Sequence, residues 1–561
     1  MKKTYSFLTV IIFLCLSPIL QAQNRITWDG SESNYWDNVD NWDLGRIPTK
    51  DDTVIVPSKS VSSNNLLIDS DGETYHLIVE SNGFFSIRSD RTLEIYGDLT
   101  LEASNSQMNA FGGGGGSIAS SSTGLILHGD LVNNGTMSFN VNTFFIFYGS
   151  SITNTGSITS IYRTPHSDTK YSIVGVPMTG ITSAVFGEIV YGYDESAAYN
   201  PTGDEGLGRF NLVASGTSMT PGAGVFSSGT ADVEMTGVPV FGDQTFALSY
   251  TDQGTSAEEP YDGFNLVANP YMAAIDVTEL FSENSAVIEE AIWLWDDGGT
   301  DDVTRRTNAD YLIVNALGAV GSGDSTSDNS SNWDGYLNIG QGFFVKALSD
   351  ADGSNLTFTD NMIVAGNNVE NSFFRKTTDR NIVKIAISDG NRFKQTIVGL
   401  SPNASKEKDH AFDAQHISAN KDLQLYSYLN NNRYAIQGLP LINEKLRVKL
   451  GYDLSEQGNY AIRIDEESLS EHYDIILEDL QEQRSHYFAN GSYSFYSEAG
   501  NDQQRFELVL MPKAVLSTPH LGNDLSVFQT QDGIELQLNN QYSGNSRGLI
   551  YNLSGKQLMQ L

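Results

Sequence analysis

The sequence predicts an all-β protein built from several consecutive units. Short segments rich in Val, Ile, Thr and aromatic residues alternate with clusters of Gly, Asn, Asp and Ser along nearly the whole chain, as is typical of strands separated by turns. Helix signals are few, and the best candidate is VTELFSENSAVIEEAI, which begins at Val277. A chain of 561 residues can bury roughly three or four separate cores.

Residues 1–23, MKKTYSFLTVIIFLCLSPILQAQ, have the features of a signal peptide. Two lysines precede an apolar segment that is too short to span a membrane comfortably. No later segment approaches a run of about 18 apolar residues, so we expect no transmembrane span. Cys15 is the only cysteine, and the exported chain would therefore depend on packed cores rather than on disulfides.

The charge of the chain excludes several classes of partner. Its 33 Lys and Arg residues stand against 69 Asp and Glu residues, for a formal net charge of −36. Nucleic acids and anionic membrane surfaces are bound through clusters of Lys and Arg, so neither is an expected partner. A soluble, self-repelling extracellular surface is the simplest interpretation of this charge.

Residues 24–160 contain weak repeats that predict a right-handed β-helix-like array. LEIYGDLT from Leu93 aligns with LILHGDLV from Leu125, and NNGTMS from Asn133 aligns with NTGSIT from Asn154. A period of roughly 20 to 30 residues, with aliphatic residues inside and Asn-Gly at the bends, suits a solenoid.

Three tryptophans precede the repeats. They could stack on sugars, but we expect them to cap the open end of the array; they are Trp28, Trp36 and Trp42.

Three further units follow along the chain. Residues 161–370 are predicted to form a tandem β-module, because two similar segments follow one another. The first part of each segment runs from a strand into a proline corner, as in KYSIVGVPM and GFNLVANPYM. The later part of each begins with a Gly-x-Gly turn and a strand, as in GAGVFSSG and GQGFFVKA. Residues 371–513 contain about nine predicted strands, which is the spacing of one β-sandwich. Residues 514–561 add a linker and another short set of strands.

The uncharged stretch GFNLVANPYMAAIDV, residues 263–277, raises the choice between a pocket wall and a buried corner. It offers no nucleophile and no acid before Asp276. Asn269 is suited to capping a turn and Pro270 to fixing its corner, while the large apolar residues would fill a core. We therefore interpret this segment as structural.

Candidate metal ligands occur in two places. WDDGGTDDV combines clustered carboxylates with glycine turns, which suits calcium, although a solvated hairpin tip is the alternative; its acidic residues are Asp296, Asp297, Asp301 and Asp302. DHAFDAQH could form a metal site or be part of a structural strand pattern; its candidate ligands are Asp409, His410, Asp413 and His416. The sequence contains no His-Glu-x-x-His and no Gly-x-Ser-x-Gly motif.

The C-terminal segment GLIYNLSGKQLMQL resembles the C-terminal sorting domain of the type IX (Por) secretion system of Bacteroidetes. Four residues carry the sorting motif; they are Ile550, Tyr551, Gly555 and Lys556. GFNLVANPYMAAID, GQGFFVKA and ITWDGSESNYWDNVDNW are similar to segments of large secreted proteins of the same bacteria. The resemblance implies that residues 514–561 are a small β-sandwich sorting domain, which is recognised at the outer membrane and then removed or replaced by an anchor.

We therefore expect a β-helix-like array, β-sandwich modules and a small sorting domain, in a protein secreted or held at the extracellular face of the outer membrane. We expect it to be adhesin-like or structural and not an enzyme, with no cofactor other than possible calcium. Its expected partners are the type IX secretion machinery and glycans or other surface proteins. The alternative is a carbohydrate-binding or polysaccharide-degrading protein that uses the β-helix face. An enzyme that degrades polysaccharides on a β-helix needs several carboxylates on one face of the helix. The repeats recognised in this sequence place Gly, Asn and Thr at those positions instead, which argues against degradation.

Overall fold

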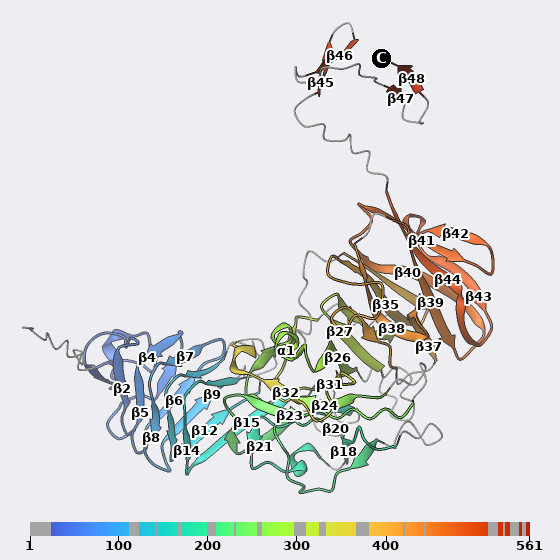
Figure 1. Cartoon of the computed structure of the whole chain (residues 1–561). Helices are drawn as coiled ribbons and strands as arrows, with labels where there is room; N and C mark the ends of the chain where they lie inside the picture. Colours follow the sequence, from blue (N-terminus) through green and yellow to red (C-terminus); the bar gives the residue numbers. More distant parts are fainter. Residues whose placement is uncertain are drawn as a thin grey trace, which may run out of the picture.

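The computed structural model of the chain confirms the all-β prediction (Figure 1). Strands arranged in several sheets make up most of the described residues, and α1 (Val277–Asn284) is a short helix of eight residues. Within the described part of the chain, no helix is long and apolar enough to cross a membrane. The structure describes residues 24–111, 123–141, 143–164, 171–187, 189–198, 209–228, 232–254, 261–296, 310–324, 333–365, 381–418, 422–441, 444–513, 525–530, 533–538, 549–551 and 557–560.

The N-terminal unit is a parallel β-helix. Its described strands lie in three sheets, ordered β1-β2-β5-β8-β11-β14, β4-β7-β10-β13 and β3-β6-β9-β12-β15-β21. Neighbouring strands are parallel, except that β21 (Asp232–Thr236) pairs antiparallel with β15. The remaining strands are β1 (Asn24–Thr27), β2 (Asp52–Val56), β3 (Leu66–Ile68), β4 (Gly72–Thr74), β5 (His76–Val79), β6 (Phe84–Ile87), β7 (Thr92–Ile95), β8 (Leu99–Leu101), β9 (Gln107–Ala110), β10 (Gly124–Leu127), β11 (Leu131–Asn133), β12 (Thr136–Phe139), β13 (Phe144–Phe147), β14 (Ile152–Asn154) and β15 (Ser157–Arg163).

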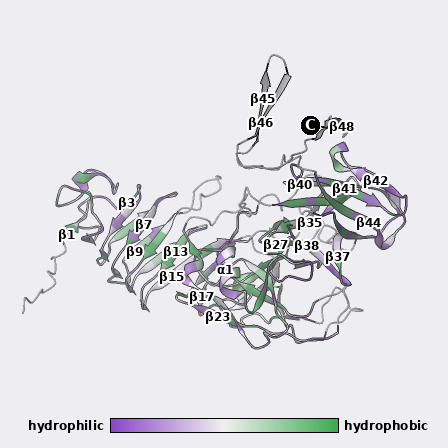
Figure 2. Ribbon diagram, turned by 45° about the horizontal axis from the view of Figure 1, so that its top comes forward, coloured by the Kyte–Doolittle hydropathy of each residue, from purple (hydrophilic) through white to green (hydrophobic). Residues whose placement is uncertain are grey.

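The strand register reproduces the repeats found in the sequence. Leu93 pairs with Leu125, and Asn133 pairs with Asn154. Because parallel strands of successive rungs are aligned, their inward side chains stack into aliphatic columns that form one continuous core. Figure 2 shows hydrophobic and hydrophilic residues together along the strands of this unit, as expected when one face of each strand is buried and the other meets solvent.

The three N-terminal tryptophans close the first rung, as predicted. Trp28, Trp36 and Trp42 are at most 2% exposed, and Trp42 packs edge-on against both other rings, with centroids 5.1 and 5.0 Å away. The indole N–H of Trp28 donates to the carbonyl of Asn64 over 2.8 Å. Buried rings offer no face to a sugar, so these residues cap the core.

The region after the β-helix contains the same strand arrangement twice. In the first copy the sheet order is β16-β20-β18-β19, and in the second it is β24-β31-β26-β27-β28. In each copy the strand that leads to a proline corner pairs antiparallel with the strand that follows a Gly-x-Gly turn. The strands are β16 (Tyr171–Val174), β18 (Ile189–Tyr193), β19 (Phe210–Leu212), β20 (Val225–Ser228), β24 (Phe264–Ala268), β26 (Ile288–Asp296), β27 (Asp310–Asn315), β28 (Gly318–Val320) and β31 (Gly342–Ala347).

The segment around Asn269 is a buried corner, which confirms its structural interpretation. Asn269 is fully buried, and its amide group donates to the carbonyls of Ala273 and Leu337 over 2.8 and 3.1 Å. The backbone N–H of Phe145 in β13 donates to the carbonyl of Met272 over 2.8 Å. The corner therefore also covers the edge of the last rung of the β-helix and joins the two units.

The predicted helix is correct only in its first half. Asp276 caps α1, because its carboxylate accepts the backbone N–H of Thr278 over 2.7 Å. Residues from Ile288 onward belong to β26, which pairs with β27 on one side and β31 on the other. Tertiary pairing of this largely buried stretch outweighs the helix propensity of its glutamates.

The strands from β34 to β44 form one near-closed sheet around a common core. Its path is β42-β41-β44-β39-β37-β38-β35-β34-β40-β43, and its two end strands follow one another in the chain. The predicted sandwich thus takes a barrel-like form. The strands are β34 (Ile382–Ser388), β35 (Arg392–Ser401), β37 (Leu423–Leu429), β38 (Asn432–Pro440), β39 (Leu446–Leu454), β40 (Gly458–Glu467), β41 (Tyr473–Asp479), β42 (Arg484–Tyr487), β43 (Tyr493–Ser497) and β44 (Gly500–Pro512).

The barrel-like sheet is joined firmly to the preceding region. Strand β29 (Ser322–Asp324) pairs antiparallel with β35, and one hydrophobic cluster contains residues of β26, β27 and β31 together with residues of β35 and β38. Strand β36 (Ala414–Gln415) pairs with β38 and so also belongs to the barrel-like sheet. Smaller sheets lie outside these units: β17 (Met178–Thr179) with β22 (Val238–Pro239), β23 (Gln244–Ala247) with β32 (Asn355–Phe358), β25 (Ala274–Asp276) between β30 (Tyr336–Leu337) and β33 (Ile363–Val364), β45 (Leu525–Thr530) with β46 (Gly533–Leu538), and β47 (Leu549–Tyr551) with β48 (Gln557–Gln560).

Candidate functional site

A column of ring side chains lies on the outer surface of the β-helix. Each of these residues directly follows a strand of the β4-β7-β10-β13 sheet, at the corner that leads to the neighbouring sheet. Backbone hydrogen bonds continue the parallel register through the corner, so the side chains project from equivalent positions on successive rungs. We call this column the Tyr–His ladder; it consists of Tyr75, Tyr96, His128 and Tyr148.

Three of the four rings of the ladder are stacked, and the ring of Tyr75 packs edge-on against that of His76. The ring of His128 stacks on that of Tyr96, with centroids 5.3 Å apart and planes at 4°, and on that of Tyr148, with centroids 5.3 Å apart and planes at 23°. Tyr75, Tyr96 and Tyr148 are 36%, 36% and 42% exposed. At the parallel-strand spacing of about 4.8 Å, the ladder is roughly 14 Å long. It is thus a continuous surface feature and not part of the core.

Glu94 holds the centre of the ladder. Its Oε1 atom lies 2.8 Å from Nε2 of His128, and its Oε2 atom accepts the hydroxyl of Tyr96 over 3.2 Å. Burial, followed by the charges of Glu94 and Glu73, raises the pKa of Tyr96. The hydroxyl therefore stays protonated at neutral pH, and a carboxylate, an imidazole and a phenol meet at one point of the surface.

A second carboxylate group stands at the C-terminal end of the ladder. Burial raises the pKa of Tyr148, and the charges of Asp360 and Glu94 raise it further. Asp360 begins the short 3-10 helix η5 (Asp360–Met362), in the region that follows the β-helix. Its Oδ1 atom is buried and has no hydrogen-bond partner among the described residues. The carboxylate of Asp360 thus adds negative charge near the C-terminal end of the ladder.

Small residues next to the ladder fix its geometry. Gly97, Gly129 and Gly149 follow the ladder residues of three successive rungs, and a Cβ atom at Gly149 would lie 2.0 Å from the carbonyl oxygen of Gly129. The next column contains Asp98 and Asp130, and the carboxylate of Asp98 accepts the backbone N–H of Asp130 over 2.9 Å. The corner is therefore tight and bonded from rung to rung, so the rings above it are held in place.

This arrangement is suited to recognition of a polar polymer. Tyrosine supplies a rigid apolar ring and a hydrogen-bonding hydroxyl at low cost in conformational entropy. The neighbouring carboxylates accept hydrogen bonds, and the repeat of the β-helix presents equivalent groups at regular intervals. A rigid surface of this kind loses little freedom when a ligand binds.

Comparison with protein families places most of the chain in one group. A family model matches residues 27–110 and 114–510, which cover the β-helix, the duplicated region and the barrel-like sheet. The chain belongs to this family, which is described as a domain of unknown function (DUF8693). The searches of curated proteins and of solved structures found no match to this chain.

The calcium candidates of the DUF8693 chain are only partly visible. Asp296 ends β26 and lies opposite Asp310 in the strand register, whereas Asp297, Asp301 and Asp302 lie outside the described residues. In the described part of the chain, no group of three or more His, Cys, Asp and Glu side chains is arranged to hold a metal ion. Calcium binding by these four aspartates stays a prediction.

The proposed sorting motif is also only partly described. Ile550 and Tyr551 belong to β47, and the backbone of this strand pairs antiparallel with that of β48. Gly555 and Lys556 lie outside the described residues. The pairing agrees with a β-strand at the expected position, and recognition of this segment by the secretion machinery stays a prediction.

The second half of the DHAFDAQH segment is part of the protein core, whereas His410 in its first half is 51% exposed. The carboxylate of Asp413, which is 1% exposed, accepts the backbone N–H groups of Gly438 and Asp409, each over 2.8 Å. His416 is also buried, and its ring packs against Tyr426. These side chains serve the fold, in line with the structural interpretation of the segment.

An ionic cluster around the buried Glu289 joins the duplicated region to the barrel-like sheet. Glu289 in β26 is 2% exposed, and its Oε1 atom lies 2.5 Å from Nζ of Lys408 and 3.8 Å from Nδ1 of His410. Burial opposes ionisation of Glu289, but the charges of Lys346 and Lys408 and the contact with His410 outweigh it and lower its pKa to about 2. Burial lowers the pKa of Lys346, which donates to Gln415, to about 8. Glu289 and Lys346 are buried, whereas Lys408 and His410 are 39% and 51% exposed and lie on the solvent side of the cluster. The contacts link β26 to the segment that follows β35, which is a structural role.

This cluster predicts a loss of stability in acid. The pKa of Glu289 is about 2 in the folded protein, whereas its ordinary value, which applies to the unfolded chain, is 4.5. Between these two pH values the unfolded chain therefore binds more protons than the folded protein. We expect the free energy of unfolding to fall by roughly 3 kcal/mol as the pH drops from about 5 to 2. Urea unfolding measured against pH tests this. Glu289→Gln should flatten the curve in that range, and parallel curves for the two proteins would contradict the assignment.

The Tyr–His ladder is the feature that sequence reasoning missed. The aligned repeats place Tyr96 on His128, immediately before the paired glycines at positions 97 and 129, and this was the signal that could have revealed it. Tyr75 and Tyr148 lie 21 residues before Tyr96 and 20 residues after His128, whereas the middle interval is 32 residues. The unequal spacing hides the column until the rungs are stacked.

Proposed function

We propose that this DUF8693 chain is a secreted or surface-attached, adhesin-like protein that binds a ligand without catalysis, and that the Tyr–His ladder is its contact surface. The observation that carries the proposal is the ladder itself, a half-exposed column of rings and carboxylates on a rigid β-helix. Exposed aromatic side chains held in fixed positions are typical of recognition surfaces. The net charge of −36 agrees with a soluble surface that repels other acidic molecules.

The proposed route of export is the type IX secretion system of Bacteroidetes. Residues 1–23 would direct the chain across the inner membrane, and residues 514–561 would be recognised at the outer membrane. The family match ends at residue 510, which supports treating the C-terminal residues as a separate unit. The partners implied are the secretion machinery and a glycan or another surface protein, with the mature chain released or held at the extracellular face.

Fractionation of cells that express the tagged full-length chain tests this proposal. In a host that has the type IX system, we expect the protein at the surface or in the medium, and an intact mass that lacks both residues 1–23 and the C-terminal segment. In a host without the system, the chain should stay in the periplasm with its C-terminus intact.

A chain truncated after Lys513 provides the control. It keeps the signal peptide and all residues of the family match but lacks the proposed sorting segment, so it should fold and remain periplasmic. Surface delivery of the truncated chain, or periplasmic retention of the full chain in the competent host, would show that the sorting assignment is wrong.

A further inference from the structure

We propose that the ligand of the Tyr–His ladder is an extended, uncharged polysaccharide that lies along the axis of the β-helix. This inference rests on the proposed function, which makes the ladder a contact surface, and adds the chemical class of the ligand. Three features of the ladder carry it: its spacing, its mixture of apolar and hydrogen-bonding groups, and its charge.

The spacing of the ladder favours a polymer over a compact ligand. Neighbouring rings are 5.3 Å apart at both measured steps, and the column continues through β4, β7, β10 and β13. This step is close to the rise of one sugar ring in an extended polysaccharide. A chain that follows the axis would therefore meet an equivalent side chain at each sugar, and weak contacts would add along one rigid surface.

The chemistry of the ladder complements that of sugar rings. Tyr96, His128 and Tyr148 stack on one another, so the edges of these rings and the tyrosine hydroxyls are the parts that a sugar would contact. The apolar C–H groups of a sugar can pack against the ring edges, while its hydroxyl groups need donors and acceptors. The tyrosine hydroxyls remain protonated because burial and nearby carboxylates raise the pKa values of Tyr96 and Tyr148. Glu94 presents carboxylate oxygens next to both Tyr96 and His128, and it would accept hydrogen bonds from sugar hydroxyls.

The charge around the ladder selects against anionic polymers. Glu73 and Glu94 act on Tyr96, and Asp360 acts on Tyr148, so carboxylates lie along the column and at its end. Polyuronates and sulfated glycans would be repelled by these groups and by the net charge of −36. A neutral polysaccharide avoids this repulsion and still satisfies the carboxylates through its hydroxyls.

Affinity electrophoresis of the purified protein tests the inference. The gels contain hydroxyethylcellulose, galactomannan or xylan as neutral extended probes, and polygalacturonate as the anionic probe. We expect the protein to be retarded by at least one neutral probe, at high salt as well as low, and not by polygalacturonate. Replacing Tyr96 and Tyr148 together with alanine should weaken binding by about tenfold or more.

Tyr496→Ala is the matched control. Tyr496 is 51% exposed on β43 of the barrel-like sheet, far in sequence from the ladder, and its loss should leave retardation unchanged. Circular dichroism and the melting temperature confirm that each variant is folded. A less drastic variant, Tyr96→Phe with Tyr148→Phe, keeps the rings and removes the hydroxyls, and it should bind more weakly than the parent and more tightly than the alanine variant.

Three results would overturn the inference. They are no retardation by any neutral probe, retardation that survives the alanine replacements, and retardation by polygalacturonate alone. None of them bears on export, which is measured by fractionation. If the protein reaches the cell surface but binds none of these polysaccharides, the adhesin-like function is retained and a protein ligand is indicated. If it binds a polysaccharide but stays in the periplasm, only the export route is refuted.

Discussion

Replacing Asp310 with alanine is expected to lower the free energy of unfolding by about 3–5 kcal/mol. Asp310 in β27 and Lys394 in β35 are each 1% exposed, and Oδ2 of Asp310 lies 2.7 Å from Nζ of Lys394. The same oxygen accepts the hydroxyl of Ser418 over 2.8 Å. Without the carboxylate, the lysine ammonium stays buried without its counter-charge, and the contact between the duplicated region and the barrel-like sheet loses its ionic centre. Chemical denaturation measures the loss.

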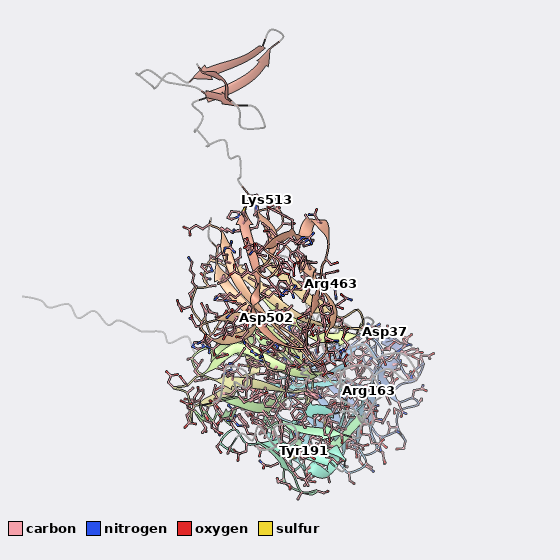
Figure 3. All side chains as sticks on the ribbon, turned by 90° about the vertical axis from the view of Figure 1, so that its right-hand side faces the viewer. Asp37, Arg163, Tyr191, Arg463, Asp502 and Lys513 are labelled. Carbon is pink, nitrogen blue, oxygen red and sulfur yellow. The ribbon has the colours of Figure 1, made fainter. Side chains whose placement is uncertain are left out.

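Two further variants separate this effect from simple loss of a contact. Replacing Asp310 with leucine and Lys394 with methionine removes both charges, so most of the stability should return. The exposed pair of Arg163 and Asp232, with side chains 38% and 43% exposed, is the matched control; Arg163 is labelled in Figure 3. Asp232→Ala should cost about 1 kcal/mol or less. Equal losses at Asp310 and Asp232 would show that burial of the pair is unimportant.

Gly129→Ala is expected to destabilise the β-helix by about 3 kcal/mol or more. A Cβ atom at this position would lie 2.3 Å from the carbonyl carbon of Gly97 and 2.6 Å from the carboxylate of Asp98. The nearest clash is with backbone, which cannot rotate away, so the rungs must separate at this corner. We expect a lower melting temperature and loss of the stacked geometry between Tyr96 and His128.

Gly458→Ala provides the comparison for this variant. Gly458 also lies at a strand, at the start of β40, but a Cβ atom there would meet only the ring of Tyr460, at the ordinary contact distance of 3.8 Å. Since alanine restricts the unfolded chain more than glycine does, this variant should be neutral or slightly stabilising. Similar destabilisation by both replacements would contradict the role assigned to the tight corner.

The general fold was readable from the sequence because its signals are local or repeated. Leu93 and Leu125 align within matching octapeptides and pair with one another in the structure. The proline corner around Asn269 was recognised from residue types that are suited to a buried turn. The extent of α1 was not readable, because the residues from Ile288 are strand only through their pairing with β27 and β31.

The candidate site was not readable in the same way. Local pattern analysis drew attention to clusters of acidic residues such as Asp296 and its neighbours, which are close in sequence. The Tyr–His ladder instead joins residues that are 20 to 32 positions apart. Whether such residues meet depends on the lengths of the corners and insertions between the strands. A single sequence does not show which residues belong to the rungs and which form loops outside them.

The sequence by itself determined the strand-forming character of this protein, the aliphatic columns of its β-helix, its capping tryptophans and its acidic surface, since all of these follow from residue types and their short-range alternation. Only the tertiary structure decided which side chains share a surface or a buried pair. Tyr96 meets His128 because two rungs stack in register, and Asp310 meets Lys394, 84 residues later, because separate sheets pack together. Such contacts depend on the packing of whole units, which local sequence preferences do not encode.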